Sequence, residues 1–164
     1  MPHCMKTIFK FFVLAVVAIS ICSCETEYQS TPLISVSSVA YVTHLDGSCD
    51  TIDFGDTLHV GDTARVVMRV MGISHPLISA EVKSEASALA CSFECDSASF
   101  KDFLEPDSRL EEGYLRFQPY VMGLWTVCRY VAKTTGDYMM TFTAESQAKE
   151  PYSHAELERK HFIR

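Results

Sequence analysis

The stretch TARVVMRVM, Thr63–Met71, carries the pattern that decides the fold. Apolar residues occupy every second position from Ala64 to Val70, and Arg65 and Arg69 stand between them. Successive side chains of a β-strand point to opposite faces, so a period of two predicts a strand with one buried and one exposed face. We therefore expect a sheet whose apolar face packs against a second layer.

Other short apolar segments follow along the chain, separated by turn residues such as Asp46-Gly47-Ser48 and Gly61-Asp62. Helical periodicity is nearly absent. These features predict an all-β fold, an antiparallel β-sandwich of about seven to eight strands. The segments with strand character cover residues 34–45, 51–54, 58–60, 63–71, 77–83, 89–95, 114–121, 124–132 and 138–144.

The alternation also predicts which side chains enter the core. The inward positions expected in residues 77–83, 89–95 and 138–144 are Ile78, Ala80 and Val82, then Leu89, Cys91, Phe93 and Cys95, then Tyr138, Met140, Phe142 and Ala144. The C-terminal residues 153–164 fit two structures. Ser153 and Glu156 have the spacing of a capping box, which favours a helix, whereas Phe162-Ile163 suits the end of a closing edge strand.

The run Thr135-Gly136-Asp137-Tyr138 comes directly before one of these predicted strands. It resembles the entry to the penultimate strand of immunoglobulin-like domains, in which a glycine turn leads to a tyrosine that anchors the corner. The resemblance implies an immunoglobulin-like sandwich. Met140 stands where those domains place their second cysteine, so an antibody-type disulfide is not implied.

The first 24 residues have the layout of an export signal. Lys6 and Lys10 precede an apolar run that ends at Cys22, and Cys24 is followed at once by acidic residues. A membrane-spanning helix needs about 20 apolar residues, and this run is shorter. The segment resembles a bacterial lipoprotein signal peptide, in which residues 21–24 would be the lipobox. An uncleaved signal anchor and a secretory signal cut elsewhere are the alternatives.

This resemblance implies cleavage before Cys24, whose thiol would carry the lipid. The implied organisation is a signal peptide at 1–23, a lipidated cysteine and flexible tether at 24–32, and a β-sandwich domain at 33–164. The membrane would then be a partner through the N-terminal lipid. The protein would be located in the bacterial cell envelope. The favoured membrane is the outer membrane, with the domain facing the periplasm or the cell surface.

Removal of residues 1–23 leaves 141 residues, enough for one hydrophobic core. The removed part holds two lysines and no acid, so the formal charge moves from −7 to −9. Phosphate binding depends on clustered lysine and arginine, and this acidic balance argues against a nucleic-acid partner.

Four cysteines remain after Cys24, namely Cys49, Cys91, Cys95 and Cys128. An even number in an exported chain predicts two disulfides, and the alternative is a set of buried free thiols. Cys91 and Cys95 on one strand would be about 13 Å apart, beyond the ~7 Å that a disulfide allows. Two connectivities then remain: Cys49 with Cys91 and Cys95 with Cys128, or Cys49 with Cys95 and Cys91 with Cys128.

Motifs for catalysis are weak. The sequence contains no phosphate-binding glycine loop and no complete nucleophile elbow, and Cys91 and Cys95 lack the two-residue gap of redox and zinc motifs. We therefore expect no enzyme activity, no cofactor and no metal. The alternative is a periplasmic metal-binding or thiol-dependent protein that uses the Cys and His set. In that case a helical tail would place His154, Glu158 and His161 on one face.

The most polar segment, residues 96–113, is the best candidate for a functional loop. It contains Phe100, Phe103 and Leu104 at the spacing of one helical turn, and Trp125 follows later in the chain. We name these four residues as candidates for a binding surface, against the alternative that each packs in the core. The sequence thus predicts a lipid-anchored envelope protein with a binding or structural role, whose partner is a protein or a glycan.

Overall fold

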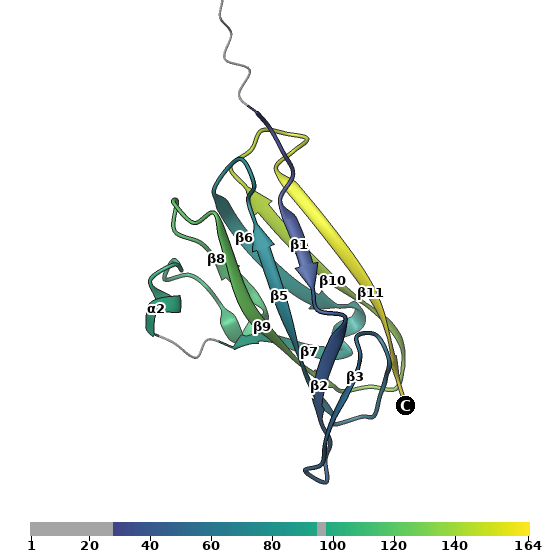
Figure 1. Ribbon diagram of the computed structural model, residues 1–164. Coiled ribbons are helices and arrows are strands. Elements are labelled where there is room, and N and C mark those ends of the chain that lie inside the picture. Colours follow the sequence, from purple (N-terminus) through teal and green to yellow (C-terminus); the bar gives the residue numbers. More distant parts are fainter. Residues whose placement is uncertain (1–27, 95–97) are drawn as a thin grey trace, which may run out of the picture.

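The computed structural model describes residues 28–94 and 98–164 (Figure 1). The predicted signal peptide, Cys24 and Cys95 lie outside the described residues. Within these two ranges the chain is almost entirely β-structure, and the α-helix α2 is a single turn, Ala98–Lys101. No helix of the described part is long and apolar enough to cross a membrane.

One sheet has six strands. Its order is β3-β2-β5-β9-β7, and β1 pairs with β5 beyond the end of β2. All of its pairings are antiparallel. The bounds are β1 Leu33–Val36, β2 Val39–Thr43, β3 Cys49–Asp53, β5 Thr63–Met71, β7 Leu89–Glu94 and β9 Gly123–Ala132.

The other sheet has five strands in the order β4-β11-β10-β6-β8. Its pairings are antiparallel except that β4 runs parallel to β11. The bounds are β4 Thr57–Leu58, β6 Leu77–Ser84, β8 Tyr114–Arg116, β10 Gly136–Ser146 and β11 His154–Ile163. Two short 3-10 turns, η1 Glu85–Ser87 and η2 Leu110–Glu112, complete the described elements.

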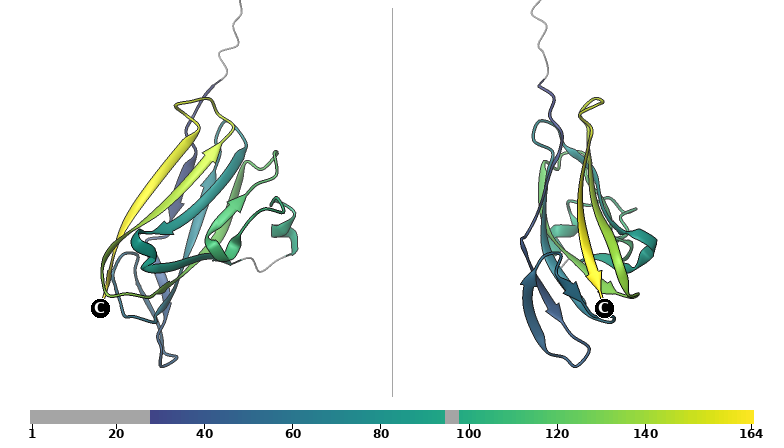
Figure 2. Two further views of the ribbon diagram at one scale, coloured as in Figure 1. Left: turned by 180° about the vertical axis from the view of Figure 1, so that it is seen from behind. Right: turned by 90° about the vertical axis from the view of Figure 1, so that its right-hand side faces the viewer.

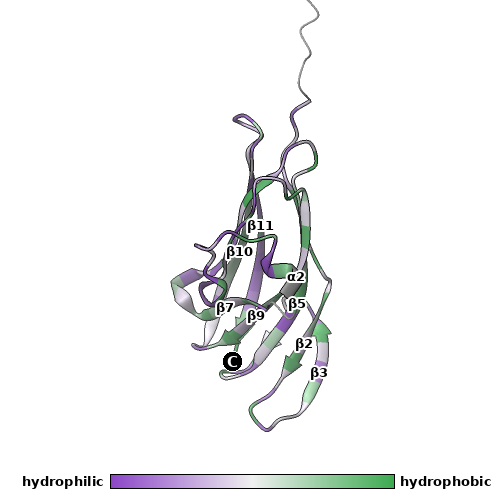
Figure 3. Cartoon of the chain, turned by 90° about the vertical axis from the view of Figure 1, so that its left-hand side faces the viewer, coloured by the Kyte–Doolittle hydropathy of each residue, from purple (hydrophilic) through white to green (hydrophobic). Residues whose placement is uncertain are grey.

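The two sheets face each other as two layers, seen edge-on in the right-hand view of Figure 2. The core lies between them and is built from alternate residues of the long strands. In β5 the side chains of Ala64, Val66, Met68 and Val70 are all at most 1% exposed, as the alternation predicts. Figure 3 shows hydrophobic and hydrophilic residues following one another along β2, β3 and β5. The predicted all-β antiparallel sandwich is confirmed.

The described chain has eleven strands, more than the seven or eight predicted. Two local features explain part of the difference. The segment expected as one strand at 34–45 divides at residues 37–38, where β1 ends and β2 begins. The tail that was consistent with a helix or a strand is the long strand β11, because it pairs with β10 from Gly136 to Glu145.

The corner before β10 is made by a glycine and a tyrosine. The Tyr138 hydroxyl donates a hydrogen bond of 2.9 Å to the carbonyl oxygen of Thr135. Gly136 has φ +144, and a Cβ there would meet the Tyr138 hydroxyl oxygen at 2.8 Å. A side chain at position 136 would therefore collide with the ring that closes the corner. Tyr138, Met140, Phe142 and Ala144 line the core as predicted.

In β6 the predicted burial of Ile78 is wrong. Ile78 is 37% exposed, while Leu77 and Ser79 on either side are buried. The pairing of β6 with β10 shifts register between Glu145 and Ser146, which marks a bulge or irregularity. An extra residue in one strand moves the side chains that follow it to the other face, so Ala80 and Val82 still point inward.

The described end of the predicted tether is attached to the domain. The backbone N–H of Ser30 donates to the Ser74 hydroxyl at 3.1 Å, and the two hydroxyl groups are 2.8 Å apart. The backbone N–H of Lys149 donates to the side-chain carbonyl of Gln29 at 2.8 Å. Residues 29–30 are thus held between the β5–β6 and β10–β11 turns, at the end of the sandwich opposite the β2–β3 hairpin (Figure 1).

Candidate functional site

The outward face of the six-stranded sheet carries exposed aromatic and cationic side chains. We call it the outer face. Its register places residues of neighbouring strands side by side: Ser35, Arg69 and Trp125 form one row across β1, β5 and β9, and Val67 pairs with Val127 in the next. The members that matter here are Tyr41, Arg65, Val67, Arg69, Trp125 and Arg129.

Two aromatic side chains on this face are open to solvent. Trp125 is 64% exposed and Tyr41 is 61% exposed. Tyr41 pairs with Arg65, and Arg65 pairs with Arg129. These three residues form a second row across β2, β5 and β9. Exposed aromatics with neighbouring arginines are the residue types enriched at binding surfaces.

The three arginines of the outer face divide between two partners: Arg65 and Arg129 share Glu94, and Arg69 contacts Trp125. The Arg65 Nε donates to both carboxylate oxygens of Glu94, at 2.9 and 3.1 Å, and the Arg129 Nε is 3.9 Å from the same carboxylate. Arg69 instead lies over Trp125, with 5.0 Å between its guanidinium carbon and the ring centroid. One glutamate thus serves two arginines, and Arg69 has an aromatic partner only, as far as the described residues go.

The four predicted binding residues separate into surface and core. Trp125 is on the outer face, and Phe103 is 40% exposed. Phe100 and Leu104 are buried members of the hydrophobic core, so the prediction that they form part of a binding surface is wrong. Phe100 lies in the single turn α2, and Leu104, three residues beyond that turn, forms a β-bridge with Phe117. The segment follows the edge of the five-stranded sheet, so Phe103 does not join Trp125.

The described cysteines do not support the predicted disulfides. Cys49, Cys91 and Cys128 are free thiols. Cys49 is on edge strand β3 and Cys91 on the opposite edge strand β7. Four inter-strand steps separate them by roughly 19 Å, which excludes the bond in the first connectivity. Cys95, required by both connectivities, lies outside the described residues.

The second connectivity required a bond between Cys91 and Cys128. Cys91 is opposite Tyr130 and Cys128 is opposite Phe93, so the two cysteines are diagonal neighbours on the inward face of β7 and β9. Burial raises the pKa of the Cys91 thiol to about 12 and that of Cys128 well above its usual range. Both thiols therefore stay protonated at neutral pH and have little nucleophilic character.

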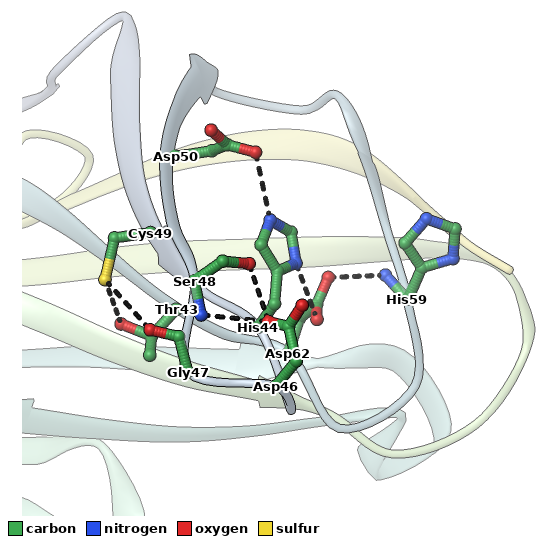
Figure 4. A network of polar contacts seen from close by, with 9 residues as sticks. All are labelled: Thr43, His44, Asp46, Gly47, Ser48, Cys49, Asp50, His59 and Asp62. Atoms are coloured by element: carbon green, nitrogen blue, oxygen red, sulfur yellow. Dashed lines mark hydrogen bonds and ion pairs between the residues drawn. The ribbon is translucent and has the colours of Figure 1, made fainter.

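A polar network lies at the β2–β3 hairpin (Figure 4). The His44 ring contacts Asp62 through Nδ1 at 3.0 Å and Asp50 through Nε2 at 3.2 Å. Asp62 is 2% exposed, and its second oxygen accepts the backbone N–H of His59 at 2.8 Å. The hydrogen bonds to Asp62 and then Asp50 raise the pKa of His44. The network holds the hairpin against the β4–β5 turn.

The histidines of the tail do not form a ligand set. His154 and Glu158 are exposed on β11, whereas His161 is buried in the core, so the predicted shared face is wrong because the tail is a strand. Across residues 28–94 and 98–164, no group of three or more His, Cys, Asp or Glu side chains could hold a metal ion.

Sequence reasoning passed over Tyr41, the three arginines and His44. The signal for Arg65 and Arg69 was present, because the alternation of β5 already put both on its exposed face. No local signal joined them to Tyr41 or Arg129, which come from strands paired only by the tertiary fold. His44 and Asp62 are 18 residues apart, and their contact likewise depends on the packing of two turns.

Comparison with known proteins adds little. No protein-family model matches the chain, and no curated protein matches it. Among solved structures it is similar to a DUF4466 family protein from Parabacteroides merdae, with 14% identity over 82% of this chain and a TM-score of 0.42. The chain spans 46% of that protein.

Two other solved structures are similar at the same low level. One is a chain of the complex between CaDoc0917 and CaCohA2, with 13% identity over 66% of this chain and 94% of that one, and a TM-score of 0.35. The other is a family 123 glycoside hydrolase from Clostridium perfringens, with 10% identity over 82% of this chain and 27% of that one, and a TM-score of 0.37. All three TM-scores are below 0.5, so the proposals below rest on this chain's own residues.

Proposed function

We propose that the protein is a bacterial cell-envelope lipoprotein, anchored by a lipid on Cys24 and located at the outer membrane. Its β-sandwich binds a protein or glycan partner through the outer face and performs no catalysis. The observation that carries the binding role is the placement of Tyr41 and Trp125. Both rings are more than half exposed on a sheet face that also carries three arginines.

The chemistry of the remaining side chains supports binding over catalysis. Two of the three described thiols are held protonated by burial, and His161 is enclosed in the core. The His44 ring has its nitrogens engaged by Asp62 and Asp50. The alternative, a metal-binding or thiol-dependent role for the Cys and His set, has less support because these residues lie on separate elements.

The position of the N-terminal residues supports an anchor that leaves the outer face free. Residues 29–30 are attached at one end of the sandwich, between two turns, and the outer face runs along its side. A lipid on Cys24 would hold that end at the bilayer. The rows containing Trp125 and Tyr41 would remain open to a partner.

The anchor is tested by the intact mass of the full chain, expressed in a Gram-negative host and purified from its membranes in detergent. The expected mass is that of a chain that starts at Cys24 and carries acyl groups, of which palmitate is one candidate. A Cys24→Ser variant serves as the control and should carry no lipid. A wild-type chain that starts at another residue without acyl groups would contradict the anchor.

The binding role is tested on arrays of bacterial surface glycans and envelope proteins, probed with the detergent-purified full chain. Binding should fall at least tenfold when Tyr41 and Trp125 are both changed to alanine. Tyr152→Ala is the matched control, since Tyr152 is also exposed but lies in the β10–β11 turn. A double variant that binds every partner as tightly as wild type would overturn the role of the outer face.

A further inference from the structure

The outer face is hollowed beside Trp125. This cleft has a volume of about 340 Å³ and is lined by Ser35, Ser37, Val67, Arg69 and Trp125. This is within the range of roughly 300–1,000 Å³ that small-molecule sites occupy. The five lining residues come from β1, the β1–β2 connection, β5 and β9. The cleft therefore exists only in the folded sheet.

Arg69 brings a charge to this cleft that no described side chain neutralises. Arg65 and Arg129 on the same face are paired with Glu94, whereas the partner of the Arg69 guanidinium among the described residues is the Trp125 ring. The Arg69 Nε is buried and has no hydrogen-bond partner within the described ranges. A guanidinium group that lacks an anion offers a planar fork of donors, whose geometry matches a carboxylate.

The other lining residues match a hydroxylated ring. The hydroxyl groups of Ser35 and Ser37 can each donate and accept hydrogen bonds. The Ser37 hydroxyl accepts the backbone N–H of Val39 at 3.2 Å, which fixes its position and leaves its proton free to donate outward. Exposed indole surface at Trp125 gives a flat apolar plane, against which the C–H face of a ring can pack.

The location of the cleft favours a sugar over a peptide. Extended peptides bind sheets by pairing with the free backbone groups of an edge strand. Here β5 is paired with β1 on one side and β9 on the other along this row, so its backbone groups are not free; of the three lining strands, only β1 has an edge that pairs with no described strand. The protein offers a cation, two hydroxyl groups and an aromatic plane within one cleft. A ligand that contacts all of them must carry a carboxylate, hydroxyl groups and an apolar ring face in one unit.

We propose that this cleft binds a uronic acid unit of an acidic polysaccharide. Arg69 holds the sugar carboxylate, Ser35 and Ser37 hydrogen-bond the ring hydroxyls, and Trp125 packs on the ring. The inference rests on the proposed binding function and names its ligand class. The charge of the face agrees with it, because three arginines stand on the central strands β5 and β9, with Glu94 on the edge strand β7, in a chain whose net charge is −7.

Tyr41 extends the same face. It pairs with Arg65, four residues along β5 from Arg69, which is about 13 Å at the rise of a strand. A polysaccharide lying along β5 would therefore meet a second aromatic ring and two further arginines, Arg65 and Arg129. Binding should be tighter for an oligomer than for a single sugar unit.

The experiment is isothermal titration of the full chain in detergent with galacturonic acid oligomers. Wild type should bind them, and raised salt should weaken the binding. Methyl-esterified oligomers of the same length, which lack the charge, should bind at least tenfold more weakly. Arg69→Gln should also lose at least tenfold, Arg69→Lys should lose less, and Trp125→Ala should lose binding while Trp125→Phe retains part of it.

The matched control is Arg159→Gln, since Arg159 is an exposed arginine on β11 of the other sheet. It should bind like wild type, and thermal melting of every variant shows whether it is folded. Equal binding of charged and esterified oligomers, or unchanged binding by folded Arg69→Gln, would overturn the acidic ligand. Preference for polyglutamate over the oligomers would replace the sugar with an acidic peptide, and the proposed binding function would stand.

Failure of the binding function itself has a different signature. In that case the variant with both Tyr41 and Trp125 changed to alanine would bind every glycan and protein on the arrays as tightly as wild type. If array binding is lost in that double variant but the uronate oligomers do not bind wild type, only the ligand class is wrong. The two results therefore distinguish an error in the proposed ligand class from an error in the proposed binding role of the outer face.

Discussion

The imidazole ring of His161 packs edge-to-face against Phe54, with 5.0 Å between the ring centroids and 69° between the planes. Tyr130 makes a similar contact at 5.2 Å. His161 is 1% exposed, and neither of its ring nitrogens has a hydrogen-bond partner among the described residues. Burial lowers the pKa of His161 to about 4, because the apolar surroundings disfavour the charged form.

This contact predicts acid sensitivity. The folded-state pKa lies below the unfolded value of 6.5, so the unfolded chain binds the proton first as pH falls. Stability should be full above pH 6.5 and should fall by up to about 3 kcal/mol as pH approaches 4. Urea unfolding at several pH values measures this. His161→Leu should reduce the loss of unfolding free energy between pH 6.5 and 4. His154→Gln, on the same strand, should leave that loss unchanged. Equal slopes in wild type and His161→Leu would contradict it.

The hairpin network predicts the opposite dependence for His44. Its pKa is raised, chiefly by the hydrogen bond to Asp62 and then by that to Asp50. Its contribution to stability should be present below the unfolded pKa of 6.5 and lost as pH rises through the folded value. In NMR titrations Asp62→Asn should lower the His44 pKa more than Asp50→Asn does. The reverse order would show that the exposed carboxylate dominates.

The corner at Gly136 predicts a difference between two glycine substitutions. Gly47→Ala adds a side chain at φ +84 with no atom within 4 Å, so it tests backbone strain alone. Gly136→Ala adds the clash with Tyr138 and should destabilise the fold by about 1–3 kcal/mol, the larger loss of the two. Tyr138→Phe should cost about 0.5–1.5 kcal/mol. Denaturant unfolding measures all three, and equal losses at positions 47 and 136 would contradict the clash.

The thiols predict selective labelling. Cys49 is exposed, while Cys91 and Cys128 are on the inward face of β7 and β9. Alkylation at pH 8 followed by peptide mass mapping should find Cys49 labelled and the other two slower by roughly a factor of a hundred or more. Labelling in denaturant is the control and should reach all three. A Cys49 that resists alkylation in the folded chain until it is reduced would show that it is oxidised after all.

The strands were predictable where a clear alternation indicates which side chains face the core. β5 runs over Thr63–Met71 as predicted, and β9 and β10 extend their predicted segments by one to a few residues at their ends. Ile78 was misplaced because the bulge that shifts it depends on the partner strand β10. Local periodicity carries no information about such an irregularity.

Residues of the candidate site were harder to predict, because the sheet order brings them together. Phe100 and Leu104 stand in a polar segment, yet both are buried, Phe100 in the turn α2 and Leu104 at its β-bridge with Phe117. Arg69 and Trp125 are 56 positions apart in the chain and become neighbours only through the β5–β9 register. The cysteine prediction placed Cys91 and Cys95 on one strand, and Cys95 lies outside the described residues. The strand order that separates Cys49 from Cys91 could not be read from the sequence.

The hydrogen bonds of residues 29–30 set how far an anchored sandwich can stand from the bilayer. Five peptide units join Cys24 to Gln29, which span at most about 18 Å. If Cys24 carries the proposed lipid, a tether this short would keep the attached end of the sandwich close to the lipid headgroups, with the β2–β3 hairpin at the far end (Figure 1). The outer face, which runs along the side of the sandwich, would then be open to a ligand beside the domain. A polymer that lies flat over the membrane would meet this face, whereas a ligand approaching from above would reach the hairpin first.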